Sequence, residues 1–135
     1  MKRVALTASI VAAFAWPAPL LAAGSLPGTY TATIKNMPPV TGTWRLTFRG
    51  VPDSHAPTKS GSFTFALHGK VWEHGGYSAT GNHIAFTDDP GTGCGTVGEV
   101  YYWNVTGKKL RFAVVSPQPC LQRALLLQRS FTKIG

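Results

Sequence analysis

The sequence predicts an all-β fold, an eight-stranded antiparallel up-and-down barrel with one short helix near the C-terminus. Short runs of β-branched and aromatic residues alternate with glycine- and proline-rich turn clusters, at the spacing of a barrel or sandwich. Apolar residues occupy every second position of most runs, the pattern of a sheet packed on one face. Closure removes exposed strand edges, and an eight-stranded barrel is either filled by side chains or holds one small ligand.

Each expected strand is bounded by turn residues. The run from Gly42 to Arg49 alternates most clearly, because Trp44, Leu46 and Phe48 share one face while threonines and arginines take the other. The expected strands, in chain order, are Thr29–Ile34, Gly42–Arg49, Phe63–Leu67, Val71–Ala79, Ile84–Phe86, Tyr101–Val105, Leu110–Val114 and Phe131–Ile134.

The segment Leu121–Arg129 departs from this alternation. It follows two prolines, and Cys120, Arg123, Ala124 and Leu127 fall at helical spacing. We therefore expect one short helix between the last two strands.

The N-terminus has the pattern of a secretory signal peptide. Met1–Arg3 is basic, Val4–Ala15 is apolar, and Leu21–Ala23 supplies small residues for cleavage. A membrane anchor is the alternative, but the apolar run is shorter than the roughly 20 residues that span a bilayer. We expect residues 1–23 to be the signal peptide and residues 24–135 a secreted or periplasmic barrel domain without a transmembrane segment.

The two cysteines, Cys94 and Cys120, both lie in the expected mature chain. Export to an oxidising compartment favours a disulfide between them over free thiols or metal ligands. Closing that loop stabilises the fold by about 3 to 4 kcal/mol in the chain-entropy model, a large share for a domain of this size.

The chain is basic, with a formal net charge of +8. Without the signal segment, which contains Lys2 and Arg3, 11 basic and 5 acidic residues remain, a net charge of +6. The basic residues are scattered rather than clustered, which disfavours nucleic acid as a partner. Weak association with anionic surfaces of the cell envelope is the interaction that this charge favours.

Several short elements occur in a defined order along the chain: Gly28–Tyr30, Gly42–Phe48, Gly76-Tyr77, Gly81, Ile84–Asp88, Cys94, Trp103, Gly107, Leu110 and Cys120–Arg123. Their order and spacing resemble an exported bacterial family of lipocalin-like, calycin-type small β-barrels. The resemblance covers nearly the whole expected mature chain and implies a barrel fold. Members of such barrel classes bind ligands, inhibit proteases or catalyse isomerisations, so the fold alone does not fix a function.

Gly42-x-Trp44 also resembles the lipocalin G-x-W element, in which a tryptophan closes the barrel base beneath a basic residue. The resemblance implies Arg129 or Lys133 as that basic residue. The chain departs from the pattern in two places: an expected strand precedes Gly42, and residues 116–119 lack the Asp that similar sequences have before the second cysteine.

Few residues of the chain indicate a metal-binding or catalytic site. His55, His68, His74 and His83 have no ligand-like short spacing, so no metal site is expected, and no cofactor is implied. No serine lies in a nucleophile elbow, and paired cysteines leave no thiolate. The sequence therefore favours a non-enzymatic role and predicts no catalytic residues.

Glu73 is the one acid in an otherwise apolar strand. It faces inward if Val71 does, and then has a raised pKa suited to acid or base catalysis. It faces solvent if Trp72 points inward, and solvent is the expectation because lone acids are seldom buried. A bulge or bend is expected at Gly75-Gly76.

Aromatic residues are expected to crowd the barrel interior, either as solid core or as the lining of a pocket with polar tyrosine tips. The leading functional hypothesis is binding of a small hydrophobic molecule in the barrel mouth. The alternatives are an interaction or inhibitor module acting through loops, of which Gly50–Lys59 is the longest, and a barrel isomerase or cyclase using Glu73 or a tyrosine. The expected ligand-binding residues are Trp44, Phe63, Phe65, Trp72, Tyr77, Tyr101, Trp103 and Phe112.

Overall fold

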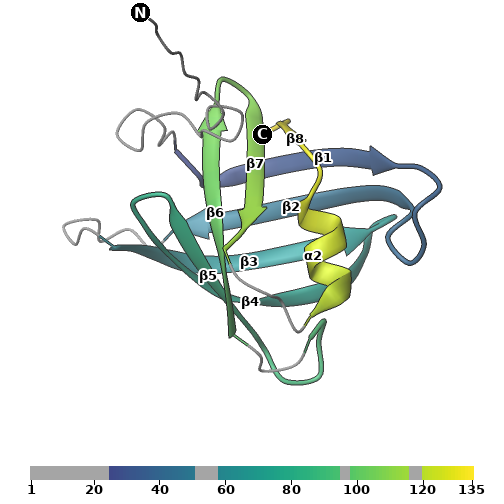
Figure 1. The fold of residues 1–135 in the computed structure, drawn as a ribbon, viewed down its shortest axis with the longest axis horizontal. Helices are drawn as coiled ribbons and strands as arrows, with labels where there is room; N and C mark the ends of the chain where they lie inside the picture. The colour runs from purple at the N-terminus through teal and green to yellow at the C-terminus, as the bar shows by residue number, and fades with distance from the viewer. Residues whose placement is uncertain (1–24, 51–57, 95–97, 116–119) are drawn as a thin grey trace, which may run out of the picture.

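The computed structural model describes residues 25–50, 58–94, 98–115 and 120–135. Eight antiparallel strands close into a barrel in which each strand pairs with its neighbours in the chain (Figure 1). The expected signal peptide lies outside the described residues. The elements are β1 Gly28–Ile34, β2 Gly42–Gly50, β3 Thr58–Leu67, β4 Lys70–Thr80, β5 His83–Asp88, β6 Gly98–Thr106, β7 Lys109–Val114, α2 Leu121–Leu127 and β8 Phe131–Lys133.

The short last strand closes the barrel. β8 pairs with β7 through Leu110 and Phe131, and with β1 through Tyr30 and Lys133. These short pairings join β1 to β7 through β8 and close the barrel, which reduces the exposed edge that an open sheet would have. The fold class predicted from the sequence is confirmed.

Aromatic rings fill the middle of the barrel. The Phe48 ring of β2 lies 6.3 Å from the ring of Phe86 on β5 and 6.4 Å from that of Phe112 on β7, measured between centroids. Phe86 also contacts Phe63 at 5.1 Å and Tyr101 at 5.9 Å. Because these contacts join strands from different sides of the barrel, rings occupy the space between them as a packed core.

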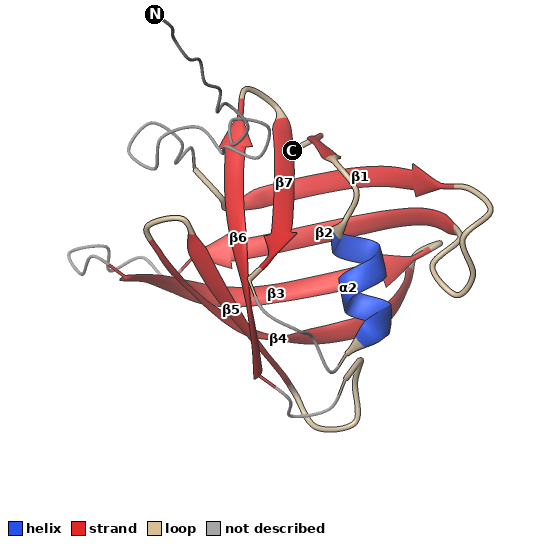
Figure 2. Ribbon diagram, viewed as in Figure 1, coloured by secondary structure: helices blue, strands red, loops and turns tan. Residues whose placement is uncertain are grey.

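Helix α2 packs against one end of the barrel (Figure 2). Its buried residues are Arg123, Ala124, Leu126 and Leu127. The helix is two residues shorter than the sequence predicts, because it ends at Leu127 and the backbone N–H of Gln128 donates to the Leu126 carbonyl.

The predicted disulfide is confirmed. Cys94 follows β5, Cys120 immediately precedes α2, and their Cα atoms lie 5.8 Å apart. The bond therefore ties the start of the helix to the loop that leaves β5.

We expect Phe48→Ala to lower the free energy of unfolding by about 3 to 5 kcal/mol, the usual cost of truncating a buried ring, because Phe48 touches rings on five other strands. Urea denaturation followed by far-UV circular dichroism measures the change. Val100→Ala, at a half-exposed position on β6, is the control, and a comparable loss in both variants would contradict a ring-packed core.

Candidate functional site

An irregularity in β4 places two consecutive side chains at the barrel end that α2 covers. Phe65 pairs with Glu73 and Ala66 with Val71, so Trp72 is an extra residue in β4. An extra residue breaks the strict alternation of faces. Trp72 consequently packs on the buried Trp44, with ring centroids 5.8 Å apart, while Glu73 is also buried.

The expectation that Glu73 faces solvent is therefore wrong: its exposed fraction is 0%. The bulge lies at Trp72 rather than at Gly75-Gly76, where the pairing with β3 and β5 is continuous. Gly75 is required for a different reason. A Cβ at that position would lie 2.1 Å from the Thr87 carbonyl oxygen, so only glycine allows this close approach of β4 to β5.

Three carboxylates from three strands surround the guanidinium of Arg123. Arg123 Nε donates to Glu73 Oε2 at 2.7 Å, Nη1 to Glu99 Oε1 at 2.8 Å, and Nη2 to Asp88 Oδ1 at 2.7 Å. The Arg123 Cζ atom also lies 5.6 Å from the ring centroid of Phe86. Arg123 is completely buried, so these bonds compensate for the hydration that its charge loses. We call these four charged residues the Arg123 cluster.

The disulfide region supplies further donors to the cluster. The backbone N–H of Cys94 donates to Asp88 Oδ2, and that of Cys120 to Glu99 Oε2, both at 2.7 Å. Gly93 brings this loop close, since a Cβ there would lie 2.6 Å from both Asp88 Oδ2 and Glu73 Cγ. The disulfide and the cluster thus hold the same end of α2.

Glu73 has one oxygen, Oε1, that is buried without a hydrogen-bond partner among the described residues. The pKa of Glu73 is raised to about 8: burial is the largest cause, a hydrogen bond with Asp88 adds to it, and Arg123 acts in the opposite direction. Burial prevails because one guanidinium is shared among three carboxylates. Glu73 is therefore mainly protonated at neutral pH.

The donor chemistry of this cluster does not suit a metal ion. Glu73, Asp88 and Cys94 bring ligand atoms within 4.8 Å of one another. The Cys94 sulfur, however, is in the disulfide, and both carboxylates already bind the Arg123 cation. A metal would have to displace a buried guanidinium without a thiolate ligand.

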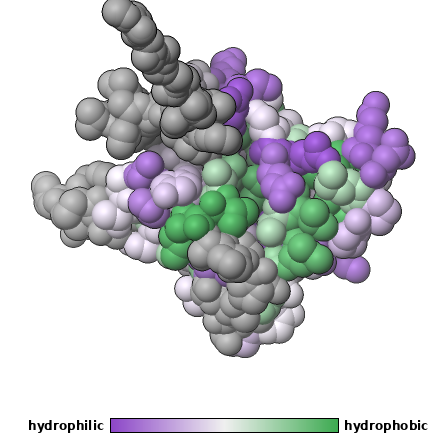
Figure 3. Space-filling view, viewed as in Figure 1, coloured by the Kyte–Doolittle hydropathy of each residue, from purple (hydrophilic) through white to green (hydrophobic). Residues whose placement is uncertain are grey.

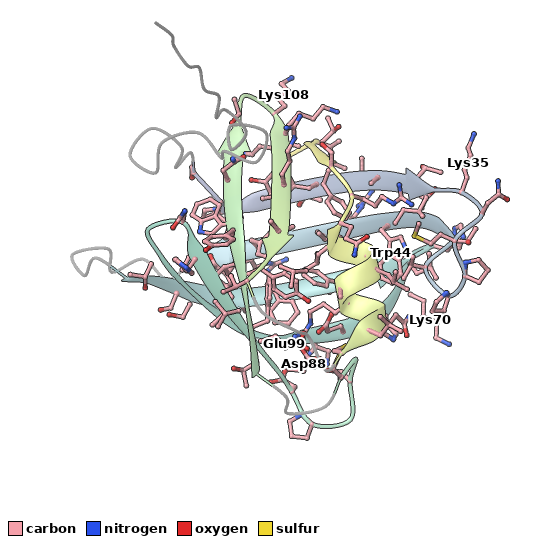
Figure 4. All side chains as sticks on the ribbon, in the orientation of Figure 1. Lys35, Trp44, Lys70, Asp88, Glu99 and Lys108 are labelled. Atoms are coloured by element: carbon pink, nitrogen blue, oxygen red, sulfur yellow. A yellow bond between two sulfur atoms is a disulfide. The ribbon has the colours of Figure 1, made fainter. Side chains whose placement is uncertain are left out.

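A cleft of about 210 Å³ opens between the barrel and α2, and its lining includes Trp72 and Gln122, the chain neighbours of Glu73 and Arg123. Its apolar part comes from β2, β3 and β4, and α2 contributes one amide side chain. Figure 4 shows Trp44 and Lys70 near α2, with Asp88 and Glu99 at the other side of the helix in this view. The lining residues are Trp44, Leu67, Lys70, Val71, Trp72 and Gln122.

Two of the eight residues expected to bind a ligand, Trp44 and Trp72, line this cleft. The remaining six are buried in the barrel, where most of their rings contact one another. These six are Phe63, Phe65, Tyr77, Tyr101, Trp103 and Phe112.

The histidines occupy separate places. His74 Nδ1 lies 2.6 Å from Asp89 Oδ2, the His83 ring lies 4.8 Å from that of Tyr102, and His68 is in the β3–β4 turn. His55 and most of the loop Gly50–Lys59 lie outside the described residues.

Neither basic residue that the G-x-W resemblance implies has a described contact with Trp44. Arg129 donates to the Met37 sulfur at 3.1 Å, and Lys133 lies 6.0 Å from the ring centroid of Tyr30. The Trp44 indole N–H instead donates to the Val40 carbonyl at 2.8 Å.

Sequence reasoning missed Asp88, Glu99 and Arg123 as a unit, although each carries a signal. Asp88 continues the inward series of Ile84 and Phe86, and Glu99 precedes Tyr101 by two residues. Arg123 lies on the apolar face of the expected helix. Charges at inward positions on three separate elements indicate a buried ion cluster, because each one alone would be too costly to bury.

We expect Glu73→Gln to flatten the pH dependence of stability. The folded-state pKa of Glu73 is raised from 4.5 to about 8, so its contribution is complete below pH 4.5 and is lost as the pH rises to about 8. The wild type should lose stability relative to the variant over this interval. Urea denaturation at several pH values measures the difference, and an increase with pH would contradict the raised pKa.

We expect Arg123→Met to lower the free energy of unfolding at pH 7 by about 3 to 5 kcal/mol, because it leaves buried carboxylates without a cation. Arg129→Met removes the same charge from a half-exposed site and should cost less. Equal losses in the two variants at pH 7 would contradict this account.

The chain was compared with known proteins in three ways: no family model matches it, and neither does any curated protein or any solved structure.

Proposed function

We propose that this protein is an exported, non-enzymatic barrel that binds a small hydrophobic molecule in the cleft between β2, β3, β4 and α2. The supporting observation is the cleft itself, where Trp44, Leu67, Val71 and Trp72 form apolar walls and Gln122 adds a polar group. Concave sites with mostly apolar walls and few polar groups are typical of small-molecule binding.

The packed core argues for the cleft rather than the barrel centre. A ligand in the centre would have to displace rings such as Phe48 and Phe86, which already contact each other. Opening such a cavity costs lost packing as well as apolar burial. The cleft needs no such rearrangement. Its volume of about 210 Å³ favours molecules below the usual size of a drug.

The surroundings of Glu73 favour a non-enzymatic role. A general base must come within hydrogen-bond distance of the proton it removes. Glu73 is closed off from solvent, and its Oε2 accepts a bond from Arg123 of α2. A substrate would reach it only after α2 had moved and the ion cluster had opened.

A secreted or periplasmic location is part of the proposal. It is supported by the signal-like residues 1–23 and by the Cys94–Cys120 disulfide, since such bonds persist in oxidising compartments. In the part of the chain that is described, no helix has the length and apolar character to cross a bilayer.

We expect Val71→Trp to fill the cleft and weaken binding of 1-naphthol, a small apolar probe, by about tenfold or more, measured by isothermal titration calorimetry. Val71 lines the cleft and is 50% exposed, so the larger side chain has room without entering the core. Val100→Trp is the matched control, because Val100 is 39% exposed on β6 and is not part of the cleft lining. Equal weakening by both variants, or no saturable binding to the wild type, would refute the proposal.

Native mass spectrometry of protein purified from its own host is the second measurement. We expect a co-purifying small apolar molecule with one-to-one stoichiometry, and less of it on Val71→Trp. Spectra that stay empty across preparations, or a molecule retained equally by both forms, count against the cleft.

A further inference from the structure

We propose that the outer face of β7, β8, β1 and β2 is a second binding surface, and that its partner is an acidic polysaccharide. This surface is separate from the apolar cleft, and the inference does not depend on the small-molecule proposal. It rests on strand register and on the distribution of charge.

The register aligns two cations and two threonines across four adjacent strands. Arg45 of β2 pairs with Thr31 of β1, Thr31 with Thr132 of β8, and Thr132 with Lys109 of β7. Neighbouring strands lie about 4.8 Å apart, so these four residues span about 14 Å. We call them the basic row. Arg111, two residues beyond Lys109, lies on the same face of β7 and is also exposed.

Hydroxyl groups supplement the cations of the basic row. Lys109 Nζ donates to Thr132 Oγ1 at 2.8 Å, which holds the ammonium in the row and leaves it two further protons to donate. Thr31 Oγ1 donates to the Trp44 carbonyl at 2.9 Å and retains its acceptor lone pairs. Thr43 and Thr47 flank Arg45 on β2 and are at least partly exposed.

The Arg123 cluster makes the outer charge more positive than the sequence total indicates. Three of the four acids in the described part of the chain, Glu73, Asp88 and Glu99, are buried around Arg123. The fourth, Asp89, pairs with His74 near the β4–β5 side. The exposed cations of the described residues, by contrast, are Lys35, Arg45, Arg49, Lys70, Lys108, Lys109 and Arg111.

Lys35 and Lys108 project away from the barrel in Figure 4, and hydrophilic residues gather near the β6–β7 turn and β8 in Figure 3. A surface with this excess of cations attracts polyanions and concentrates them near it. Arginine adds a bidentate fork that matches carboxylate and sulfate groups.

The chemistry of the row favours a polysaccharide over a membrane. Proteins that lie in a bilayer interface insert apolar side chains beside their cations. The basic row contains no such side chain. Among the large exposed apolar residues of the described chain, Val71, Val100 and Leu121 lie on β4, β6 and α2, Val114 and Val115 lie at the far end of β7 from Lys109, and Ile134 directly follows β8. Threonine hydroxyls between the cations instead match the alternating hydroxyl and carboxylate groups of an acidic sugar chain.

The test is fluorescence anisotropy with a labelled alginate hexasaccharide at low and at physiological salt. We expect Arg45→Gln and Lys109→Gln each to weaken binding by about three- to tenfold. Lys35→Gln removes the same charge from an exposed position outside the row, after β1, and should change the affinity less than twofold. Circular dichroism confirms that each variant is folded; all three positions are exposed.

Three outcomes would overturn the proposal. Equal weakening by the three variants would indicate attraction by net charge alone. Absence of saturable binding to alginate would exclude this partner class. Tighter binding to vesicles containing 30% phosphatidylglycerol, or to double-stranded DNA, with the same dependence on Arg45 and Lys109, would assign the surface to a membrane or to nucleic acid.

Discussion

The Arg123 cluster is the interaction on which the organisation of this barrel end depends. It joins β4, β5 and β6 to α2 through one guanidinium, in surroundings without access to solvent. Removing ions from water is expensive, and each partner is tolerated only because the others are present. The cluster therefore holds α2 to three strands at once through directional bonds.

The disulfide and the cluster act on the same segment by different physical means. The Cys94–Cys120 bond limits the unfolded chain, while the backbone N–H groups of these two residues bond to Asp88 and Glu99. The effect of the disulfide on the unfolded chain has no direction, whereas the two hydrogen bonds fix the positions of Cys94 and Cys120 relative to Asp88 and Glu99. Together they hold α2 beside Trp44 and Trp72, so that Gln122 completes the wall of the cleft.

The same cluster links the interior to the outer surface. Because most acids of the described chain serve as partners of Arg123, few remain to neutralise the exposed lysines and arginines. Burial of one cation with three carboxylates thus increases the positive charge of the surface. A barrel built in this way has an apolar cleft at one end and a cationic, hydroxyl-bearing sheet face, two surfaces of opposite chemistry.

Local patterns in the sequence determined the strands and their number. The alternation in Gly42–Arg49 predicts which side chains face inward, because it depends on neighbours in the chain. Some strand bounds differ from the expectation, since β3 begins at Thr58 instead of Phe63 and β6 at Gly98 instead of Tyr101. The cysteine pair also followed from sequence, since a signal-like N-terminus and an even cysteine count favour a bond. The orientation of Glu73 did not follow from the sequence, because the extra residue at Trp72 is defined by the pairing of β4 with β3. Likewise only the closed barrel brings Asp88, Glu99 and Arg123 together, from positions up to 35 residues apart, where packing and desolvation decide which charges are buried.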